Sequence, residues 1–318
     1  MASNINTRLE ELQGEIKKLG LSTLIKRDFV NVCSDDGIAI RVMQWNMLAQ
    51  GLSSGADNFI KCPPEALDWS TRKLRVLEEI LRYQPTVLCM QEVDNFDYLI
   101  ENLSSYGYLG IFKEKPSSPC LFQANNCGPD GCALFYQSSK VTLSKSDSII
   151  LEENGVKCNQ VSIIAHFITK DKYQKQFIVG TTHLKAKKDF SDVRMLQGQF
   201  ISKYLEDNCN DAPVIFCGDF NAEPSESVYS VMKSCKLGLS SSYTLLSKDD
   251  SEPKYTTWKI RPKAEECHTI DYVWYQKKGL KVKSILDVAS DEEIGKDRLP
   301  SFRYPSDHLS LVCDFIVL

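Results

Sequence analysis

Six short apolar runs, each with polar side chains at or beside one end, limit what this chain can fold into more than any other feature. They are Ile38–Trp45, Thr86–Met90, Phe177–Thr182, Pro213–Cys217, Thr269–Tyr275 and Leu309–Phe315. Runs of this length, bounded by polar residues, predict buried strands. The polar residues beside them are therefore expected at strand ends, where a sheet fixes the position of reactive side chains.

Helical patterns lie between these strands. Three segments place apolar residues three or four apart, namely Pro64–Leu81, Asp94–Leu103 and Phe190–Leu205. Many strands and a few long helices, without a break in composition, predict one α/β domain.

The N-terminal segment has a pattern of its own. Apolar residues recur at helical spacing between residues 7 and 19, at Leu9, Leu12, Ile16 and Leu19. This spacing predicts an amphipathic helix. We expect residues 1–30 to form a helical appendage and residues 31–318 to form the main domain.

Charge and hydropathy exclude several classes of protein. The 38 Lys and Arg against 42 Asp and Glu give a net charge of −4, whereas domains that coat nucleic acid usually have a pI above about 9. The mean hydropathy is −0.26, and no run of about 18 apolar residues predicts a membrane span. We therefore expect no membrane contact and no stable partner.

Cysteine usage and the N-terminus bear on the compartment. The 12 cysteines are scattered without CxxC spacing, which is typical of buried reduced thiols and not of a zinc site. The first 20 residues have no apolar stretch of the kind found in secretory signals. We expect a cytoplasmic protein, with a mitochondrial location as the alternative.

The polar residues at the strand ends form one chemical inventory. It consists of four carboxylates, two imidazoles and two amides: Glu92, Asp219, Asp271, Asp307, His183, His308, Asn46 and Asn221. Oxygen-rich ligands without thiolates suit Mg²⁺, with Mn²⁺ as the alternative. Such a set favours in-line cleavage of a phosphate ester, and the chain has no GxSxG motif for acyl transfer.

Each of these residues also has a purely structural interpretation. Glu92 follows an apolar run and could cap the next helix, while residues 218–221 could be only a tight turn. The Asp307–His308 dipeptide could be a helix cap or a buried hydrogen-bonded pair. We interpret His166, inside an alternating strand, as structural, and we favour the same interpretation of His268.

Ten stretches of the sequence resemble a known superfamily. They are RVMQWNMLAQ (41–50), QEVD (91–94), KPSSPC (115–120), GPDGCALF (128–135), NQV (159–161), THLKAK (182–187), GDFNAEP (218–224), YTTWKIR (255–261), HTIDYVWY (268–275) and LPSFRYPSDHLSLVCDF (299–315). Together they resemble the exonuclease–endonuclease–phosphatase superfamily, with its deoxyribonuclease-I-like fold. The resemblance implies a four-layer α/β/β/α sandwich of two mixed β-sheets flanked by helices.

The same resemblance implies a role for each matching residue. Glu92 would be the main Mg²⁺ ligand, with Asn46 beside it at the metal and the phosphate. Asp219 would orient or activate the attacking water, and Asn221 would hold the phosphoryl group. His183 would donate to a phosphate oxygen.

Three further residues would complete the hydrolytic centre. His308 would act there, with Asp271 as the carboxylate that orients it, and Asp307 would lie next to the metal. A histidine held by a carboxylate keeps one tautomer and gains basicity. The sequence leaves open which group is the general base.

Two candidate activities differ in their substrate. The stretches THLKA and YTTWKIR resemble one branch of the superfamily, which implies removal of the 2′-phosphate from NADP⁺ and NADPH. The alternative is a 3′-exonuclease (deadenylase) acting on poly(A) RNA, which would need a longer basic groove and stacking aromatics. The basic residues attached to the motifs are few, which favours a compact small-molecule substrate: Lys115, Lys185, Lys187 and Arg261.

The chain also departs from the pattern of that branch. Lys187 stands where Arg is expected, which keeps the charge but loses bidentate geometry. Ser117 stands where Trp is usual, which removes a stacking surface. No GxGxxG fingerprint follows a strand, so NADP(H) is expected as a substrate and not as a redox cofactor. A non-enzymatic interaction module is the third hypothesis, and the complete set of polar residues argues against it.

Overall fold

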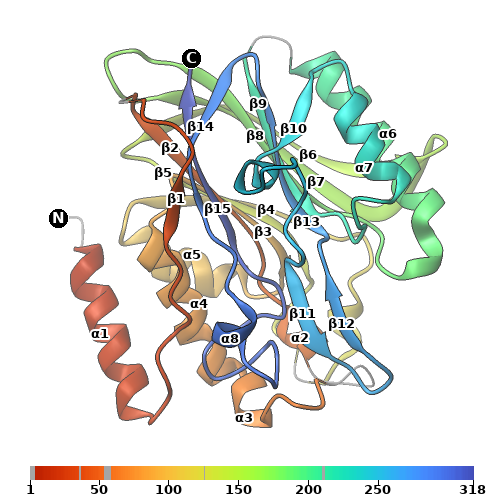
Figure 1. The fold of residues 1–318 in the computed structure, drawn as a ribbon. Coiled ribbons are helices and arrows are strands. Elements are labelled where there is room, and N and C mark those ends of the chain that lie inside the picture. The colour runs from red at the N-terminus through yellow and green to blue at the C-terminus, as the bar shows by residue number, and fades with distance from the viewer. Residues whose placement is uncertain (1–3, 36, 54–58, 125, 210–211) are drawn as a thin grey trace.

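The computed structural model describes residues 4–35, 37–53, 59–124, 126–209 and 212–318. Within these residues, one sheet has seven strands in the order β1-β14-β15-β2-β3-β5-β4, and a second has six in the order β10-β13-β9-β8-β7-β6. The strands β11 and β12 form a separate hairpin, which is labelled in Figure 1.

The elements have the following bounds. The α-helices are α1 (Ile5–Lys18), α2 (Gln50–Ser53), α3 (Pro64–Leu67), α4 (Trp69–Tyr83), α5 (Phe96–Ser104), α6 (Ser191–Asn208), α7 (Ser227–Ser234) and α8 (Asp291–Ile294), and the 3₁₀ helices are η1 (Pro119–Phe122), η2 (Lys188–Phe190) and η3 (Tyr243–Leu246). The strands of the first sheet are β1 (Phe29–Asn31), β2 (Ala39–Asn46), β3 (Val87–Val93), β4 (Tyr108–Glu114), β5 (Gly131–Gln137), β14 (Leu280–Leu286) and β15 (Leu311–Val317). The other strands are β6 (Val141–Glu153), β7 (Val156–Thr169), β8 (Gln176–His183), β9 (Val214–Asp219), β10 (Leu239–Ser241), β11 (Thr257–Ile260), β12 (Glu265–His268) and β13 (Asp271–Gln276).

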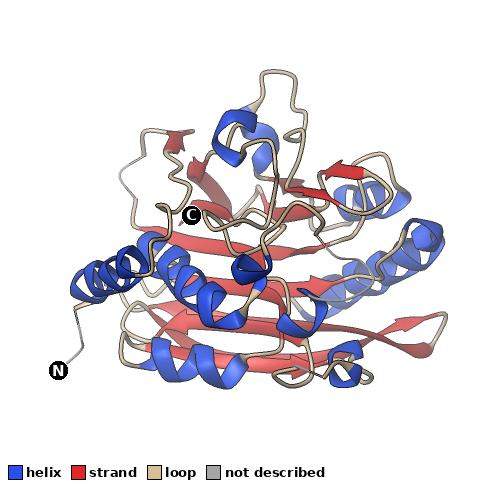
Figure 2. Cartoon of the chain, turned by 90° about the horizontal axis from the view of Figure 1, so that it is seen from below, coloured by secondary structure: helices blue, strands red, loops and turns tan. Residues whose placement is uncertain are grey.

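Three buried apolar clusters show that the two sheets and their helices form four layers. The first cluster joins α4 and α5 to the outer face of the seven-stranded sheet. The second lies between the sheets, and the third joins α6 and α7 to the outer face of the six-stranded sheet. Figure 2 shows the strands in layers with helices around them. The four-layer α/β/β/α sandwich is thereby confirmed.

Alternation along the strands explains why the runs are almost continuously apolar. In β3, Leu88 and Met90 face the helices, whereas Val87 and Cys89 face the second sheet. Both faces of such a strand are covered, so each side chain needs an apolar surface. This is the origin of the sequence pattern that predicts the strands.

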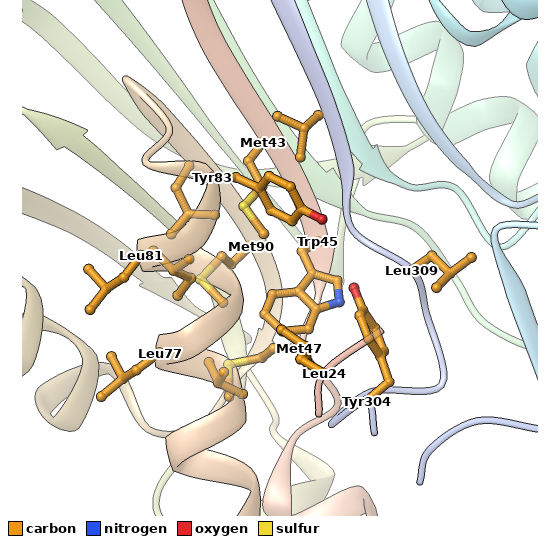
Figure 3. Packing of buried hydrophobic residues seen from close by; sticks show 14 of the residues in the cluster. Leu24, Met43, Trp45, Met47, Leu77, Leu81, Tyr83, Met90, Tyr304 and Leu309 are labelled. Atoms are coloured by element: carbon orange, nitrogen blue, oxygen red, sulfur yellow. The ribbon is translucent and has the colours of Figure 1, made fainter. Parts of the chain in front are cut away.

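The first cluster also connects the core to residues near the polar strand ends. Trp45 is fully buried, and its ring centroid lies 5.8 Å from that of Tyr304; Figure 3 shows both rings beside Met47 and Leu24. The Trp45 indole nitrogen donates to the backbone oxygen of His308 at 2.8 Å. Since Asn46 follows Trp45 directly, this packing holds two of the predicted site residues.

Each sheet contains one pair of parallel strands joined by a crossover helix. These units are β2–α4–β3, in which Asn46 pairs with Gln91, and β8–α6–β9, in which His183 pairs with Asp219. The antiparallel strand β13 places Asp271 opposite Asp219. Ligands of open α/β sheets bind beyond the carboxyl ends of parallel strands, and the polar residues stand at those ends.

The structure differs from the sequence predictions in detail. The segment Pro64–Leu81 forms two helices, because the Asp68 side chain accepts from the Ser70 N–H at 2.7 Å and begins a new helix there. The N-terminal helix buries Leu12 and Ile16, but Leu19 lies beyond its end and is exposed. None of the described helices is long and apolar enough to cross a membrane.

Candidate active site

A cleft of about 470 Å³ opens at the edge where the carboxyl ends of β2, β8 and β9 meet. Six of the eight predicted catalytic and metal residues line it: Glu92, His183, Asp219, Asn221, Asp307 and His308. The other two, Asn46 and Asp271, are buried and hydrogen-bonded to lining residues. The structure therefore brings all eight side chains together.

Asn46 joins the two carboxylates of the cleft. Its side-chain nitrogen donates to Glu92 at 3.0 Å and to Asp219 at 2.9 Å. Its side-chain oxygen accepts from the backbone N–H of Leu48 at 3.0 Å, which fixes the orientation of the amide. One neutral side chain thus holds two negative groups near each other.

Glu92 reaches the cleft from an irregular part of β3. Its φ of +54° is unusual for a residue with a side chain, and the register with β5 shifts between Met90 and Val93. Bulges of this kind redirect a side chain out of the regular alternation. A second bond, from the Ala49 N–H at 3.2 Å, holds the Glu92 carboxylate in place.

His308 is paired with Asp271 as the sequence resemblance implies. The His308 Nδ1 lies 2.9 Å from Asp271 Oδ2, and the Thr256 hydroxyl donates to the same oxygen at 2.6 Å. Burial disfavours the charge on His308, but the carboxylates of Asp271, Asp307 and Asp219 outweigh it and raise the pKa of His308 to about 9. This imidazole is a cation and hydrogen-bond donor at neutral pH.

Asp219 lies between the two histidines. Its Oδ2 is 3.6 Å from His183 Nε2 and 3.8 Å from His308 Nε2. Burial and the charge of Asp271 raise the pKa of Asp219. Burial and the positive charge of Lys115 lower the pKa of His183 to about 4, so this imidazole is neutral near pH 7. The Nδ1 of His183 is buried and has no hydrogen-bond partner among the residues that the structure describes.

Asn221 is held by the two loops that follow β8 and β9. Its backbone has a φ of +50°, a conformation that asparagine tolerates better than most residues. Its N–H donates to Asp219 Oδ1 at 2.8 Å, and its side-chain nitrogen donates to the Leu184 oxygen at 3.1 Å. The GDFN turn therefore has a defined geometry at the cleft.

The sequence analysis missed Lys259, which is buried in the wall of the cleft beside Asp307. Its Nζ lies 2.6 Å from Asp307 Oδ2, and Arg261 lies 3.8 Å from the same oxygen. Burial opposes the charge on Asp307, but Lys259, His308 and Arg261 together hold the pKa of Asp307 well below its usual range. The period of two along β11 could have found Lys259, because it puts this residue on the same face as Arg261.

The four predicted basic residues occupy different places. Lys187 and Arg261 line the cleft, together with Lys263, which the sequence analysis did not single out. Lys115 pairs with buried Asp130 at 2.5 Å. The ammonium of Lys185 lies 4.6 Å from the centre of the Phe190 ring. Lys115 and Lys185 are not among the described residues that line the cleft.

The donor set of the cleft fits a divalent cation. Asp219, Asp271 and His308 lie in one buried group whose candidate ligand atoms are within 4.8 Å of one another, and the carboxylate of Glu92 is linked to this group through Asn46. Because His308 is protonated at neutral pH, the carboxylates are the donors of this group that a cation would use. Carboxylate oxygens predominate, which is what hard cations require. No described residue of the cleft lining is a cysteine.

Comparison with known proteins agrees with this geometry. The model of the Endonuclease/Exonuclease/phosphatase family matches residues 43–308, a span that includes all the residues of the cleft. The chain belongs to this family. The sequence resemblance to the superfamily is thereby confirmed.

Within the family, the chain is similar to nocturnins. Nocturnin of Rattus norvegicus is 52% identical over 297 residues, which cover 91% of this chain and 69% of the rat protein. The structure of the human Nocturnin catalytic domain with bound sulfate anion has 44% identity and a TM-score of 0.78, and covers 92% of this chain and 98% of that one. A more distant relative is the CCR4-Not complex 3′-5′-exoribonuclease subunit Ccr4 of Debaryomyces hansenii, 25% identical over 332 residues, which cover 89% of this chain and 39% of that protein.

Proposed function

We propose that this protein is a Mg²⁺-dependent phosphatase that removes the 2′-phosphate from NADP⁺ and NADPH to give NAD⁺ and NADH. The observation that supports it best is the composition of one cleft: a buried acid–histidine centre lies beside a small group of cations. The cations are Lys187, Lys259, Arg261 and Lys263. A compact ligand with several phosphates suits such a cleft.

Each side chain of the centre has a role that follows from its protonation and position. His308 is a cation that can donate to an oxygen of the phosphoryl group. Asp219 lies 3.6 Å from His183 Nε2 and 3.8 Å from His308 Nε2, and it can orient a water molecule for in-line attack. His183, neutral and with an unpaired Nδ1, can donate one hydrogen bond without adding charge.

Glu92 is the residue that would hold the metal ion, with Asn46 and Asp219 next to it. A bound Mg²⁺ would neutralise phosphoryl oxygens and so lower the cost of charge in the transition state. Asn46 keeps Glu92 and Asp219 at fixed positions. The site residues act by positioning and by electrostatics, which suits phosphoryl transfer.

The size of the cleft favours a small molecule over a long strand. About 470 Å³ lies in the range of ordinary small-ligand sites. A poly(A) nuclease would follow several phosphates and stack several bases. The described lining residues include no Trp, Tyr or Phe.

The decisive experiment compares two substrates with one preparation. Purified protein with Mg²⁺ should release phosphate from NADPH and leave NADH, measured by phosphate detection and by separation of the nucleotides. The Glu92→Ala variant is the matched control for a contaminating phosphatase. Absence of phosphate release by the unaltered protein would reject the proposal.

The second candidate is a 3′-exonuclease acting on poly(A) RNA. The exoribonuclease named among the relatives supports it, because the same centre could cleave a phosphodiester. Shortening of a poly(A) oligonucleotide that disappears in Glu92→Ala, without phosphate release from NADPH, would establish this candidate over the first.

A further inference from the structure

The loop between β8 and α6 presents Lys187 to the cleft in an unfavourable backbone conformation. Lys187 has a φ of +78° and a ψ of 142°, a region that residues with a side chain rarely adopt. Lys187 is an exposed residue that lines the cleft. Such conformations persist only where the surrounding structure over-determines them, so the loop must be held by something outside the cleft.

Arg194, in the first turns of α6, holds this loop from behind. Its side chain is fully buried and is not among the residues that line the cleft. The Nη1 donates to the backbone oxygen of Lys185 at 3.0 Å and to that of Lys187 at 2.7 Å. Gln197, one turn further along α6, accepts from the Lys185 N–H at 3.0 Å. The backbone on both sides of the bend is therefore bonded to one helix.

A second loop is bonded to the same guanidinium. Its Nε and Nη2 donate to Glu226 Oε2 at 3.0 and 2.7 Å. Glu226 ends the segment that begins with Asp219 and Asn221, so Arg194 ties the loops after β8 and β9 to each other. The carboxylate also neutralises the buried cation, and it is the reason that the arginine is tolerated there.

We propose that Arg194 is a positioning residue for substrate binding, which acts through Lys187. By fixing the carbonyls of the loop, it aims the Lys187 ammonium at an anionic group of the substrate; this rests on the proposed function only for the identity of that substrate. Lysine could not replace it, because a single ammonium lacks the planar fork that reaches both loops. Glu226 has the same positioning role, because it holds the Arg194 guanidinium.

The test is a double-mutant cycle between Arg194 and Lys187 in the full chain. Lys187→Ala and Arg194→Met should each raise KM for NADPH about tenfold, the effect of one lost charged hydrogen bond, with little change in kcat. The double variant should be no worse than either single variant, since coupled residues are non-additive. A merely structural role would reduce the active fraction, and therefore kcat, and would multiply with Lys187→Ala.

Two further measurements keep the test decisive. Should Arg194→Met fail to fold, the cycle is run with Glu226→Gln, which keeps the shape of the side chain. Glu226→Gln should raise KM in the otherwise unaltered protein but not in the Lys187→Ala variant. Lys203→Met removes an exposed ion pair from the same helix and should leave KM unchanged. Independent effects in the cycle would overturn the proposal.

Pyrophosphate binding separates this inference from the proposed function. The affinity of the unaltered protein and the variants for pyrophosphate, measured by calorimetry, does not depend on turnover. If NADPH is not hydrolysed but Arg194→Met and Lys187→Ala weaken pyrophosphate binding without additivity, only the proposed substrate fails. If Lys187→Ala weakens binding and Arg194→Met does not, or if neither does, the positioning role is wrong.

Discussion

The units β2–α4–β3 and β8–α6–β9 are built alike, but they have different roles in the proposed reaction. In each, a buried arginine of the crossover helix donates to carbonyls of the loop that follows the first strand: Arg72 to Met47 and Leu48, and Arg194 to Lys185 and Lys187. Arg72 also donates to Pro305, in the segment before β15. The first unit delivers Asn46 and Glu92 to the cleft; the second delivers His183 and Asp219. The same arrangement of helix and arginine is thus used in both units: the first holds the proposed metal ligand, and the second holds the residues proposed to orient water and bind the anion.

The two arginines differ in how their charge is compensated. Arg194 is paired with Glu226, whereas Arg72 donates only to neutral oxygens among the described residues. Burial lowers the pKa of Arg72 to about 10. Because Arg72 has no hydrogen bond to a carboxylate among the described residues, its charge acts at longer range on Asp94, Asp307 and Glu92. The difference indicates that the first unit is shaped to hold negative charge.

Of the substitutions that test this comparison, Glu92→Ala should have the largest effect on activity. Removing the proposed metal anchor should lower kcat/KM about a thousandfold or more, since metal ions contribute several kcal/mol to transition states of this kind. Phosphate release with increasing Mg²⁺ is the measurement. Glu266→Ala, which removes another carboxylate of the same cleft, is the control and should remain active. Full activity in Glu92→Ala would contradict the metal assignment.

Asp271→Asn should have the next largest effect. An amide cannot hold the His308 tautomer, so kcat should fall by about a hundredfold or more. Asp271 is the strongest of the charges that raise the pKa of His308 to about 9. Activity that needs the protonated imidazole exists below this pKa, so the alkaline limb of the pH–rate profile should move to lower pH in the variant. A limb that stays in place would show that another group titrates there.

Arg72→Met, compared with Arg194→Met, tests how the two buried arginines differ in their contribution to stability. It should lower the free energy of unfolding by about 3 kcal/mol, because several buried carbonyls lose their donor. Arg194→Met should cost less, since the Glu226 carboxylate that it leaves is partly exposed. Urea unfolding of both variants is the measurement. Equal losses of unfolding free energy would mean that the ion pair of Arg194 with Glu226 makes no difference to the cost of removing the arginine.

The smallest effect distinguishes two lysines of one loop. Lys187→Ala should raise KM for NADPH about tenfold, whereas Lys185→Ala should change it less than about threefold, since its ammonium lies over Phe190. Both variants keep the loop backbone and its bonds to Arg194. Initial rates at varied NADPH decide between them. A larger effect of Lys185→Ala would place the anion on the other side of the loop.

The strands and their polar ends could be predicted because both depend on local sequence: a buried strand is a short apolar run, and it ends at a polar residue. The ends of β2, β8 and β9 fall within one or two residues of the predicted runs, because buried strands are apolar on both faces and stop where a polar side chain begins. The GDFN and SDH motifs add chemistry that few structural turns share. The apolar runs and their polar ends made the α/β class and most of the candidate site accessible from sequence, whereas the four-layer sandwich was predicted from the resemblance to the superfamily.

The supporting residues could not be predicted in this way. Arg72 and Arg194 lie on helices where an isolated arginine usually indicates a solvated face, and only the tertiary structure supplies their carbonyl partners. Lys259 was overlooked although β11 alternates. The split at Asp68 depends on one capping bond, which outweighed a pattern that reads as a single helix.

The place of β15 has a consequence for how this enzyme can be made. The final strand of the sequence is inserted between β14 and β2, near the middle of the first sheet, and His308 lies three residues before it. A chain that stops before residue 311 leaves that sheet in two parts, with the edges of β14 and β2 open. Partial products of synthesis or proteolysis should therefore be inert and prone to aggregate, so that activity appears only once the polypeptide closes the gap.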